Sequence, residues 1–171
     1  MFKNLEDAVR GSAFACVRNL CCPDYDCLLR QIVCFKKVHK DAVIPTKAHK
    51  NDSGFDLHSV EDVELKPMER KIVKTGLVWE AEHQELQVRP RSGLAIKYGI
   101  TVLNSPGTVD ASYRGEIGVI LINLSTETYN VKKGDKIAQA VIAELHYTTA
   151  LEIEEVGSSE RNNGGFGSTG K

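Results

Sequence analysis

Beyond residue 33, short apolar runs alternate with turn residues along the chain. The runs that predict strands are Asp62–Leu65, Lys71–Thr75, Glu85–Arg89, Gly118–Asn123, Tyr129–Val131 and Ala138–Leu145. Turn residues between them include Lys66-Pro67 and Lys133-Gly134-Asp135. The run from Ile117 to Leu124 is apolar except for Gly118 and Asn123, which is typical of a strand buried on both faces. Because no long amphipathic helical pattern follows residue 34, the pattern predicts an all-β barrel or sandwich of jelly-roll type.

The two ends of the chain differ from this middle part. Residues 5–20 carry apolar side chains at helical spacing, interrupted by Gly11. Residues 157–171 read GSSERNNGGFGSTGK and hold five of the 14 glycines, with almost nothing to bury. We therefore expect three parts: an N-terminal appendage over 1–33, a β-barrel over 34–156, and a flexible arm over 157–171.

The cysteines are confined to the first 34 residues. They are Cys16, Cys21, Cys22, Cys27 and Cys34. An odd number cannot form a closed disulfide framework, and their spacing lacks the paired C-x2-C pattern of zinc sites. Reduced thiols are the preferred interpretation. The acidic residues Glu6 and Asp7 argue against a signal peptide or a mitochondrial presequence at the N-terminus. We therefore expect the protein in the cytoplasm.

Composition narrows the class of protein. The chain has 171 residues, 42% of them hydrophobic, and a formal net charge of −1. This composition is ordinary for a globular domain. The small net charge disfavours nonspecific electrostatic binding of nucleic acid. No apolar run is long enough to span a membrane.

The C-terminal segment from Gly165 to Lys171 matches the pattern G-x-x-x-x-G-K of phosphate-binding loops. A nucleotide-hydrolysing P-loop needs a helix after the lysine, and none can follow here, so that interpretation is weak. The residue types still suit a nucleotide: Ser168 and Thr169 supply hydroxyl donors, Arg161 a planar cation, and Phe166 a face for base stacking. A mobile tail without a role is the plainer alternative.

Four further segments carry polar groups suited to phosphate chemistry. Arg91 and Ser92 lie in a turn after a strand, Asp56 is a possible metal-facing carboxylate, and Gln139 is an amide donor in a strand that follows a turn. Asp110 lies beside a tight turn and could act as a general base, although a turn carboxylate more often bonds to local backbone. Each segment alone is a weak signal.

Taken in order, the five segments resemble the trimeric dUTPase family. They read SGFDL, RPRSGLA, NSPGTVDASYRG, KKGDKIAQ and RNNGGFGSTG, and they span about Cys34 to Gly170. The resemblance implies a jelly-roll-like homotrimer in which motifs of all three chains build each active site. It also implies hydrolysis of dUTP to dUMP and pyrophosphate with Mg²⁺ as cofactor, which limits uracil in DNA and supplies dUMP for dTMP synthesis. Ser53 and Ser112 stand where the family more often has Ala and Asp.

The resemblance also implies a role for each site residue. Asp110 is the general base that activates a water for attack on the α-phosphorus, and Asp56 orients waters around Mg²⁺. The substrate-binding residues are Arg91, Ser92, Gly93 and Gln139 at the phosphates, Asn104, Gly107 and Val109 in the hairpin that reads uracil, Tyr113 under the deoxyribose, and Arg161, Phe166, Gly167, Ser168 and Thr169 in the closing arm.

Three other functions compete with this interpretation. A dCTP deaminase resembles the same fold, but that family places a catalytic Glu ten residues after its counterpart of Asp110, where this chain has Ile120. A nucleotide-gated binding or signalling module is suggested only by the appendage over 1–33. A catalytically silent barrel is disfavoured by the complete set of motif residues.

Overall fold

The computed structural model describes residues 33–164. These residues form eleven strands and one short helix. The elements are β1 (Cys34–Lys37), β2 (Gly54–His58), β3 (Val63–Leu65), β4 (Arg70–Lys74), β5 (Leu77–Glu80), β6 (Gln84–Arg89), α3 (Ser92–Tyr98), β7 (Ile100–Val102), β8 (Gly107–Val109), β9 (Gly118–Asn123), β10 (Tyr129–Val131) and β11 (Lys136–Glu144). The fold class is therefore all-β, as the sequence pattern predicts.

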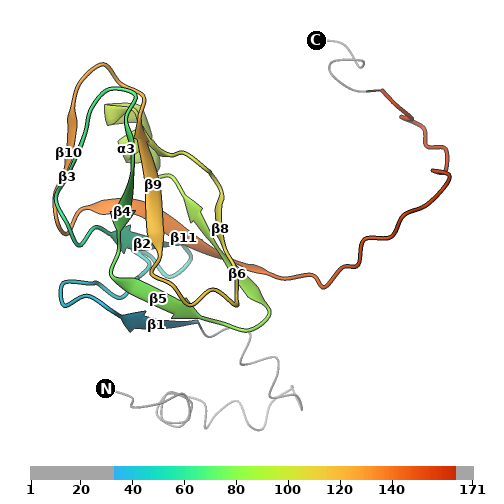
Figure 1. The fold of residues 1–171 in the computed structure, drawn as a ribbon, viewed down its shortest axis with the longest axis horizontal. Helices are drawn as coiled ribbons and strands as arrows, with labels where there is room; N and C mark the ends of the chain where they lie inside the picture. Colours follow the sequence, from blue (N-terminus) through green and yellow to red (C-terminus); the bar gives the residue numbers. More distant parts are fainter. Residues whose placement is uncertain (1–32, 165–171) are drawn as a thin grey trace, which may run out of the picture.

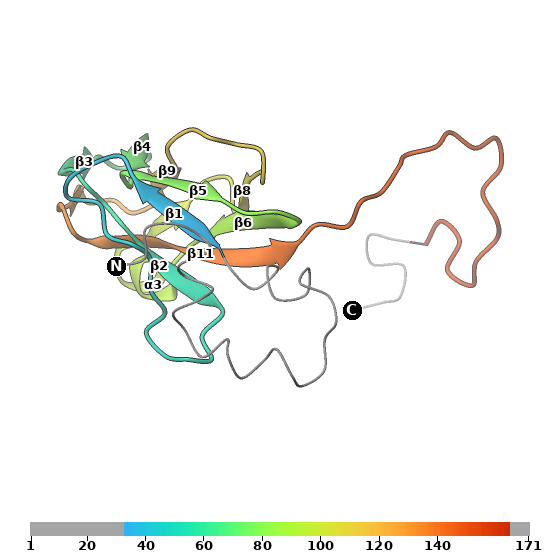
Figure 2. The same ribbon diagram turned by 90° about the horizontal axis from the view of Figure 1, so that it is seen from below.

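The strands form four antiparallel sheets around one core (Figures 1 and 2). The largest has the order β2-β11-β6-β8, and a second has the order β4-β9-β7. Strands β1 and β5 pair with each other, as do β3 and β10. Most neighbours in the sheets are distant in sequence, as expected for a jelly-roll-like arrangement.

Successive side chains along the strands of the large sheet point alternately to a core face and to a polar face. Leu57 of β2 pairs with Ala138 of β11, and both are fully buried. One residue earlier on β2, Asp56 pairs with Gln139, which pairs on its other side with Arg89 of β6. Because successive side chains of a strand point to opposite faces, these three polar residues form a row across the outer face.

Buried polar groups tie the second sheet to its neighbours. Asn123 ends β9 fully buried, and its amide donates to the carbonyl oxygens of Leu65 and Glu127 over 2.9 and 2.7 Å. Its side-chain oxygen accepts from the backbone N–H of Ser125 at 2.9 Å. The buried Thr75 hydroxyl donates to the Ile117 carbonyl at 2.7 Å. These bonds satisfy polar groups that would otherwise destabilise the core.

All six strands predicted from the sequence are present, within two residues at each end. In β9, Val119, Leu121 and Ile122 are buried and Ile120 is half-buried, so this strand is covered on both faces. The pattern missed β1, β2, β5, β7 and β8, which are short, and the seven-residue helix α3.

After β11 the chain leaves the barrel as an extended segment over residues 145–164 (Figure 1). The predicted appendage lies outside the described residues apart from Val33, so the boundaries of the three expected parts remain predictions. Within residues 33–164, no helix is long and apolar enough to cross a membrane.

Candidate active site

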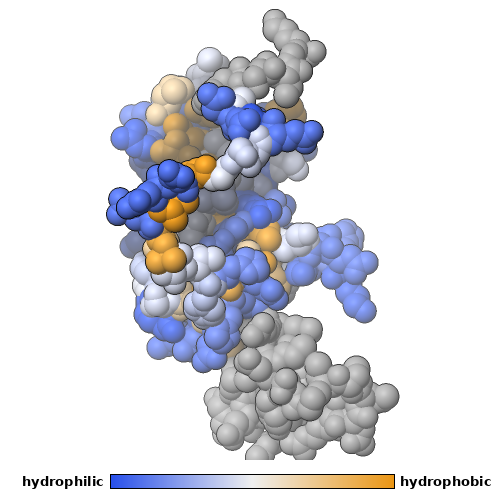
Figure 3. Space-filling model, turned by 90° about the vertical axis from the view of Figure 1, so that its right-hand side faces the viewer, coloured by the Kyte–Doolittle hydropathy of each residue, from blue (hydrophilic) through white to orange (hydrophobic). Residues whose placement is uncertain are grey.

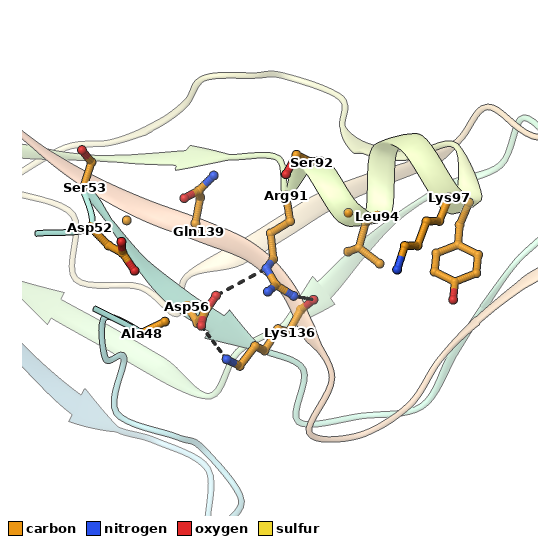
Figure 4. Close-up of a pocket in the computed structure, with 13 residues that line it drawn as sticks. Ala48, Asp52, Ser53, Asp56, Arg91, Ser92, Leu94, Lys97, Lys136 and Gln139 are labelled. Atoms are coloured by element: carbon orange, nitrogen blue, oxygen red, sulfur yellow. Dashed lines mark hydrogen bonds and ion pairs between the residues drawn. The ribbon is translucent and has the colours of Figure 1, made fainter. Parts of the chain in front are cut away.

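A cavity of about 500 Å³ opens on the polar face of the large sheet, beside α3 (Figure 4). Its walls come from the loop before β2, from β2, from the first turn and end of α3, and from β11. The residues that line it are Ala48, Asp52, Ser53, Gly54, Asp56, Arg91, Ser92, Gly93, Leu94, Lys97, Tyr98, Lys136 and Gln139. Three of these side chains are cationic and two are carboxylates, so the lining carries a net positive charge that suits an anion.

Asp56 is the centre of the charged cluster. Lys136 Nζ lies 2.7 Å from its Oδ2, and Arg91 Nε lies 3.4 Å from its Oδ1. The Arg91 guanidinium also donates to the Lys136 carbonyl at 3.1 Å. The Asp56 side chain is only 15% exposed, so this carboxylate is held in place by two cations in a partly desolvated position.

Gln139 is oriented by the segment that precedes α3. Its Nε2 donates to the Pro90 carbonyl at 2.9 Å. Its Oε1 lies over Gly54, where an added Cβ would overlap it. A glycine at position 54 is therefore needed for this placement, which puts the amide in the cavity beside Asp56 (Figure 4).

Arg91, Ser92 and Gly93 form the junction between β6 and α3. Pro90 fixes the turn, and Arg91 takes an extended backbone conformation as the N-cap of the helix. An added Cβ at Gly93 would meet no atom within 4 Å, so the backbone here faces open space in the cavity. This junction can therefore present backbone N–H groups, a hydroxyl and a guanidinium to one anionic ligand.

Three residues near the cavity were not singled out from the sequence. Lys136 is one of three lysines in KKGDKIAQ, and Lys97 lies two residues after RPRSGLA. Only the folded chain shows that Lys136 contacts Asp56 and that both lysines line the cavity. Burial lowers the pKa of His58, against the opposing effect of the Asp56 carboxylate. Its Nδ1 is buried without a hydrogen-bond partner among residues 33–164. A neutral His58 adds no charge to the cluster.

The hairpin that carries Asp110 does not line this cavity. Asn104 packs against Gly107, and Val109 ends β8. Asp110 is exposed, and its carboxylate makes no hydrogen bond or ion pair with any residue in the described part of the chain. Tyr113 follows in the same turn, where its N–H donates to the Asp110 carbonyl at 3.1 Å. The structure therefore separates this hairpin from the anion-binding residues of the same chain.

The arm residues are likewise absent from the cavity. Arg161 is exposed, and its Nε donates to the Gly164 carbonyl at 2.7 Å within a local turn. Phe166, Gly167, Ser168 and Thr169 lie outside the described residues. Of the residues predicted for the site, one chain thus brings together Asp56, Arg91, Ser92, Gly93 and Gln139.

Comparison with solved structures finds close likeness in shape. A mutant dUTPase of Staphylococcus bacteriophage 80alpha, solved with dUpNHpp, has a TM-score of 0.77 and 27% identity, covering 82% of this chain and 99% of that one. A mutant dUTPase of phage phi11 of S. aureus, described as revealing the coordination of a structural Mg(II) ion, has a TM-score of 0.69 and 25% identity, covering 74% of this chain and 99% of that one.

Sequence comparisons extend over most of the chain. A protein named deoxyuridine 5'-triphosphate nucleotidohydrolase from Nautilia profundicola is 57% identical over 137 residues, which cover 80% of this chain and 96% of the relative. One of the same name from Clostridium kluyveri is 53% identical over 136 residues, with 79% and 95% covered. The family model described as dUTPase matches residues 40–170. These matches confirm the resemblance drawn from the five motifs: the chain belongs to the dUTPase family.

Proposed function

We propose that this protein hydrolyses dUTP to dUMP and pyrophosphate, with water attacking the α-phosphorus. The observation that carries the proposal is the convergence of Asp56, Arg91, Ser92, Gly93 and Gln139 on one cationic cavity. A nucleoside triphosphate concentrates negative charge, and its pyrophosphate leaving group gains more as the bond breaks. The names of the curated relatives supply the substrate.

Asp110 is the proposed general base. An ionised carboxylate beside the α-phosphorus takes a proton from the attacking water as the new P–O bond forms. Its lack of partners within the described residues leaves its oxygens free for that water. Arg91, Ser92 and Gly93 would hold the phosphates in line, and Gln139 would donate to the phosphate chain.

Asp110 and the cavity would then meet in a homotrimer with shared active sites. One chain provides the anion-binding cavity, a second the hairpin from Asn104 to Tyr113, and a third the arm. The separation of these parts within one chain supports this arrangement. So do the large apolar side chains at the surface, including Ile72, Ile96 and Leu103 on the barrel and Leu151, Ile153 and Val156 on the arm. Figure 3 shows hydrophobic residues exposed on the side from which the arm leaves.

Magnesium fits the donor set of the cavity. Among residues 33–164 no group of three or more His, Cys, Asp or Glu side chains could hold a metal alone. Mg²⁺ suits this setting because it is usually bound by one or two carboxylates, waters and substrate phosphates. Asp56 would hold it through water, and the ion would neutralise charge on the triphosphate. Chelation should abolish turnover, and added Mg²⁺ should restore it.

Substrate selection would rest on the hairpin and on Tyr113. Backbone groups near Asn104, Gly107 and Val109 would pair with the uracil edge, which rejects bases with a different donor pattern. Tyr113 would pack under the deoxyribose. The arm would close the site. Arg161, Ser168 and Thr169 would contact the γ-phosphate, Phe166 would stack on the base, and Gly167 would bind the substrate between Phe166 and Ser168.

We place the reaction in the cytoplasm, an assignment supported by the free thiol of Cys34, the one cysteine within the described residues.

Isotope transfer tests the proposed bond cleavage. Turnover of dUTP in water enriched in oxygen-18 should place the label in dUMP, because the attacked phosphorus stays with the nucleoside. Label in pyrophosphate would show attack at the β-phosphorus and would contradict the role given to the cavity.

A further inference from the structure

His83 lies beside the point where the chain leaves the barrel. The pairing of β6 with β11 ends at Gln84 and Glu144, so the next residues outward, His83 before β6 and Leu145 after β11, also lie side by side. The Leu145 N–H donates to the His83 carbonyl at 2.8 Å. We call residues 145–147 the arm root, because the extended segment that leads to the arm begins here (Figure 1).

Tyr147, at the end of the arm root, contacts the His83 side chain in two ways. Its Oη lies 2.6 Å from His83 Nδ1, and the hydroxyl donates to that nitrogen when the neutral ring carries its proton on Nε2. The two rings meet edge to face, with their centroids 5.6 Å apart. Because Tyr147 is 78% exposed, burial contributes little, and these two contacts hold the arm root.

The backbone of His83 adopts the left-handed conformation, with φ of 60°. Residues other than glycine rarely adopt this conformation, although asparagine, aspartate and histidine do so more often than the rest. In this conformation His83 accepts from Leu145 with its carbonyl and contacts Tyr147 with its ring. One residue of the barrel therefore sets the direction in which the arm root leaves.

Tyr147 is the last residue through which the described part of the chain bonds to the barrel. Residues 146–163 are all exposed. Beyond Tyr147, the hydrogen bonds within the described chain join residues of the segment 159–164 only to one another. The contact with His83 is thus the final constraint on the path of the arm.

The arm starts far along the chain from this constraint. Arg161, the first arm residue proposed to contact the substrate, follows Tyr147 by 14 residues. A flexible chain of that length has a root-mean-square end-to-end distance of about 20 Å. An arm root fixed in one direction confines the arm to part of this space, whereas a free root lets it sample directions that lead away from the site.

We propose that His83 and Tyr147 are positioning residues, which direct the arm from the barrel toward the active site that it closes. The inference rests on the proposed function, in which the arm closes the site. Neither side chain lines the cavity, so both act through the arm. Without their contact, His146 and Tyr147 join the mobile part of the chain and must be ordered at each closure, which opposes closing.

The test measures kcat/KM for dUTP, with Mg²⁺ present, in variants of the two residues. Tyr147→Phe removes the hydroxyl and keeps the ring, and kcat/KM should fall about fivefold, the usual net effect of one hydrogen bond on an equilibrium. His83→Gly should lower it at least as much, because glycine accepts the left-handed backbone but has no ring. His83→Asn should retain the wild-type value, since asparagine tolerates this backbone and its amide can bond to the Tyr147 hydroxyl.

His146→Asn is the matched control. His146 is the neighbour of Tyr147 in the arm root, and it makes no hydrogen bond, ion pair or ring contact within residues 33–164. Its kcat/KM should equal that of wild type, whereas a fall as large as that of Tyr147→Phe would show that any change in the arm root suffices and would overturn the proposal.

Truncation after residue 160 separates arm positioning from a general effect on the barrel. Without residues 161–171 there is no arm to direct, so Tyr147→Phe should leave the residual kcat/KM unchanged. In the full-length variant, amide hydrogen exchange at the arm root should be faster than in wild type.

Three results would each overturn the proposal: an equal fall in kcat/KM in both backgrounds, an unchanged value in full-length Tyr147→Phe, or unchanged exchange at the arm root. Wild-type protein that fails to hydrolyse dUTP would instead overturn the proposed function, and this inference with it.

Discussion

Asp56 is held by two cations from distant parts of the chain. Lys136 follows a turn at the start of β11, and Arg91 precedes α3, yet both contact the same carboxylate on β2. Asp56 and Arg91 could be predicted from the sequence because their types and flanking turns suit phosphate chemistry. Lys136 could not, since a lysine after a turn is ordinary until the register of β2 and β11 brings it opposite His58 and beside Asp56.

Replacement of Lys136 by Gln should weaken substrate binding more than chemistry. The change removes one of three cations from the cavity lining and leaves Arg91 as the one cation paired with Asp56, so less of the Asp56 charge is offset near the phosphates. We expect KM for dUTP to rise about tenfold, the effect of about 1.4 kcal/mol in binding. Lys133→Gln is the control, because Lys133 pairs with Asp41 and does not line the cavity. Equal KM values for the two variants would contradict the role of Lys136.

Glu69 gives a pH dependence of stability that is independent of the site. The Lys66 backbone N–H, at 2.9 Å, and Lys71, at 3.1 Å, lower the pKa of this carboxyl. A carboxyl with a lowered folded-state pKa stabilises the fold above its unfolded pKa of about 4.3, and that contribution is lost as pH falls through the folded-state pKa.

Glu69→Gln should therefore lower the melting temperature more at pH 7 than at pH 3. Thermal unfolding of both proteins across this range measures the difference. A deficit of the same size at both pH values would show that the Glu69 charge contributes nothing.

At the scale of elements, the strands of six or more residues were all predictable, whereas of the four three-residue strands only β3 and β10 were. β6, β9 and β11 alternate or run apolar over six to nine residues. β7 and β8 have three residues each, and their pairing with β9 and β6 is set by contacts distant in sequence. α3 is a single seven-residue segment in which no residue is fully buried, so no helical periodicity marks it.

Removal of residues 161–171 should abolish most turnover and leave the barrel folded. Arg161 is exposed and bonds only within its local turn, so no core contact among the described residues is lost with it. Circular dichroism and thermal unfolding should match the full-length protein, while dUTP turnover falls at least about a hundredfold, as for loss of groups that act on the transition state. Unfolding of the truncated protein would contradict the proposal that the arm is a closing segment.

At the scale of the whole molecule, a single chain holds two separated halves of the proposed site. The cavity contains the anion-binding residues, and the hairpin with Asp110 lies outside it. The motifs predicted which residues belong to the site, but not which of them one chain brings together. In the proposed trimer, that division depends on how copies of the chain assemble, which no local pattern encodes.

Co-expression of two inactive variants tests the shared site. Arg91→Ala disables the cavity and Asp110→Asn disables the base, so each variant alone should be nearly inactive. In mixed trimers, a cavity from one variant can meet an Asp110 from the other, and activity should recover to roughly a quarter of wild type if chains assort at random. No recovery in mixed assemblies would mean that each site lies within one chain.

Pyrophosphate release tests the central claim most directly. Wild type and Asp110→Asn are compared with dUTP, dCTP, dTTP and UTP in the presence of Mg²⁺. We expect wild type to release pyrophosphate from dUTP far faster than from the others, and Asp110→Asn to be slower by about 10²–10⁴-fold, as for a lost general base. Unchanged turnover in Asp110→Asn would contradict the assignment of the base. Ammonia released from dCTP, or tight dUTP binding without turnover, would contradict the proposed hydrolysis itself.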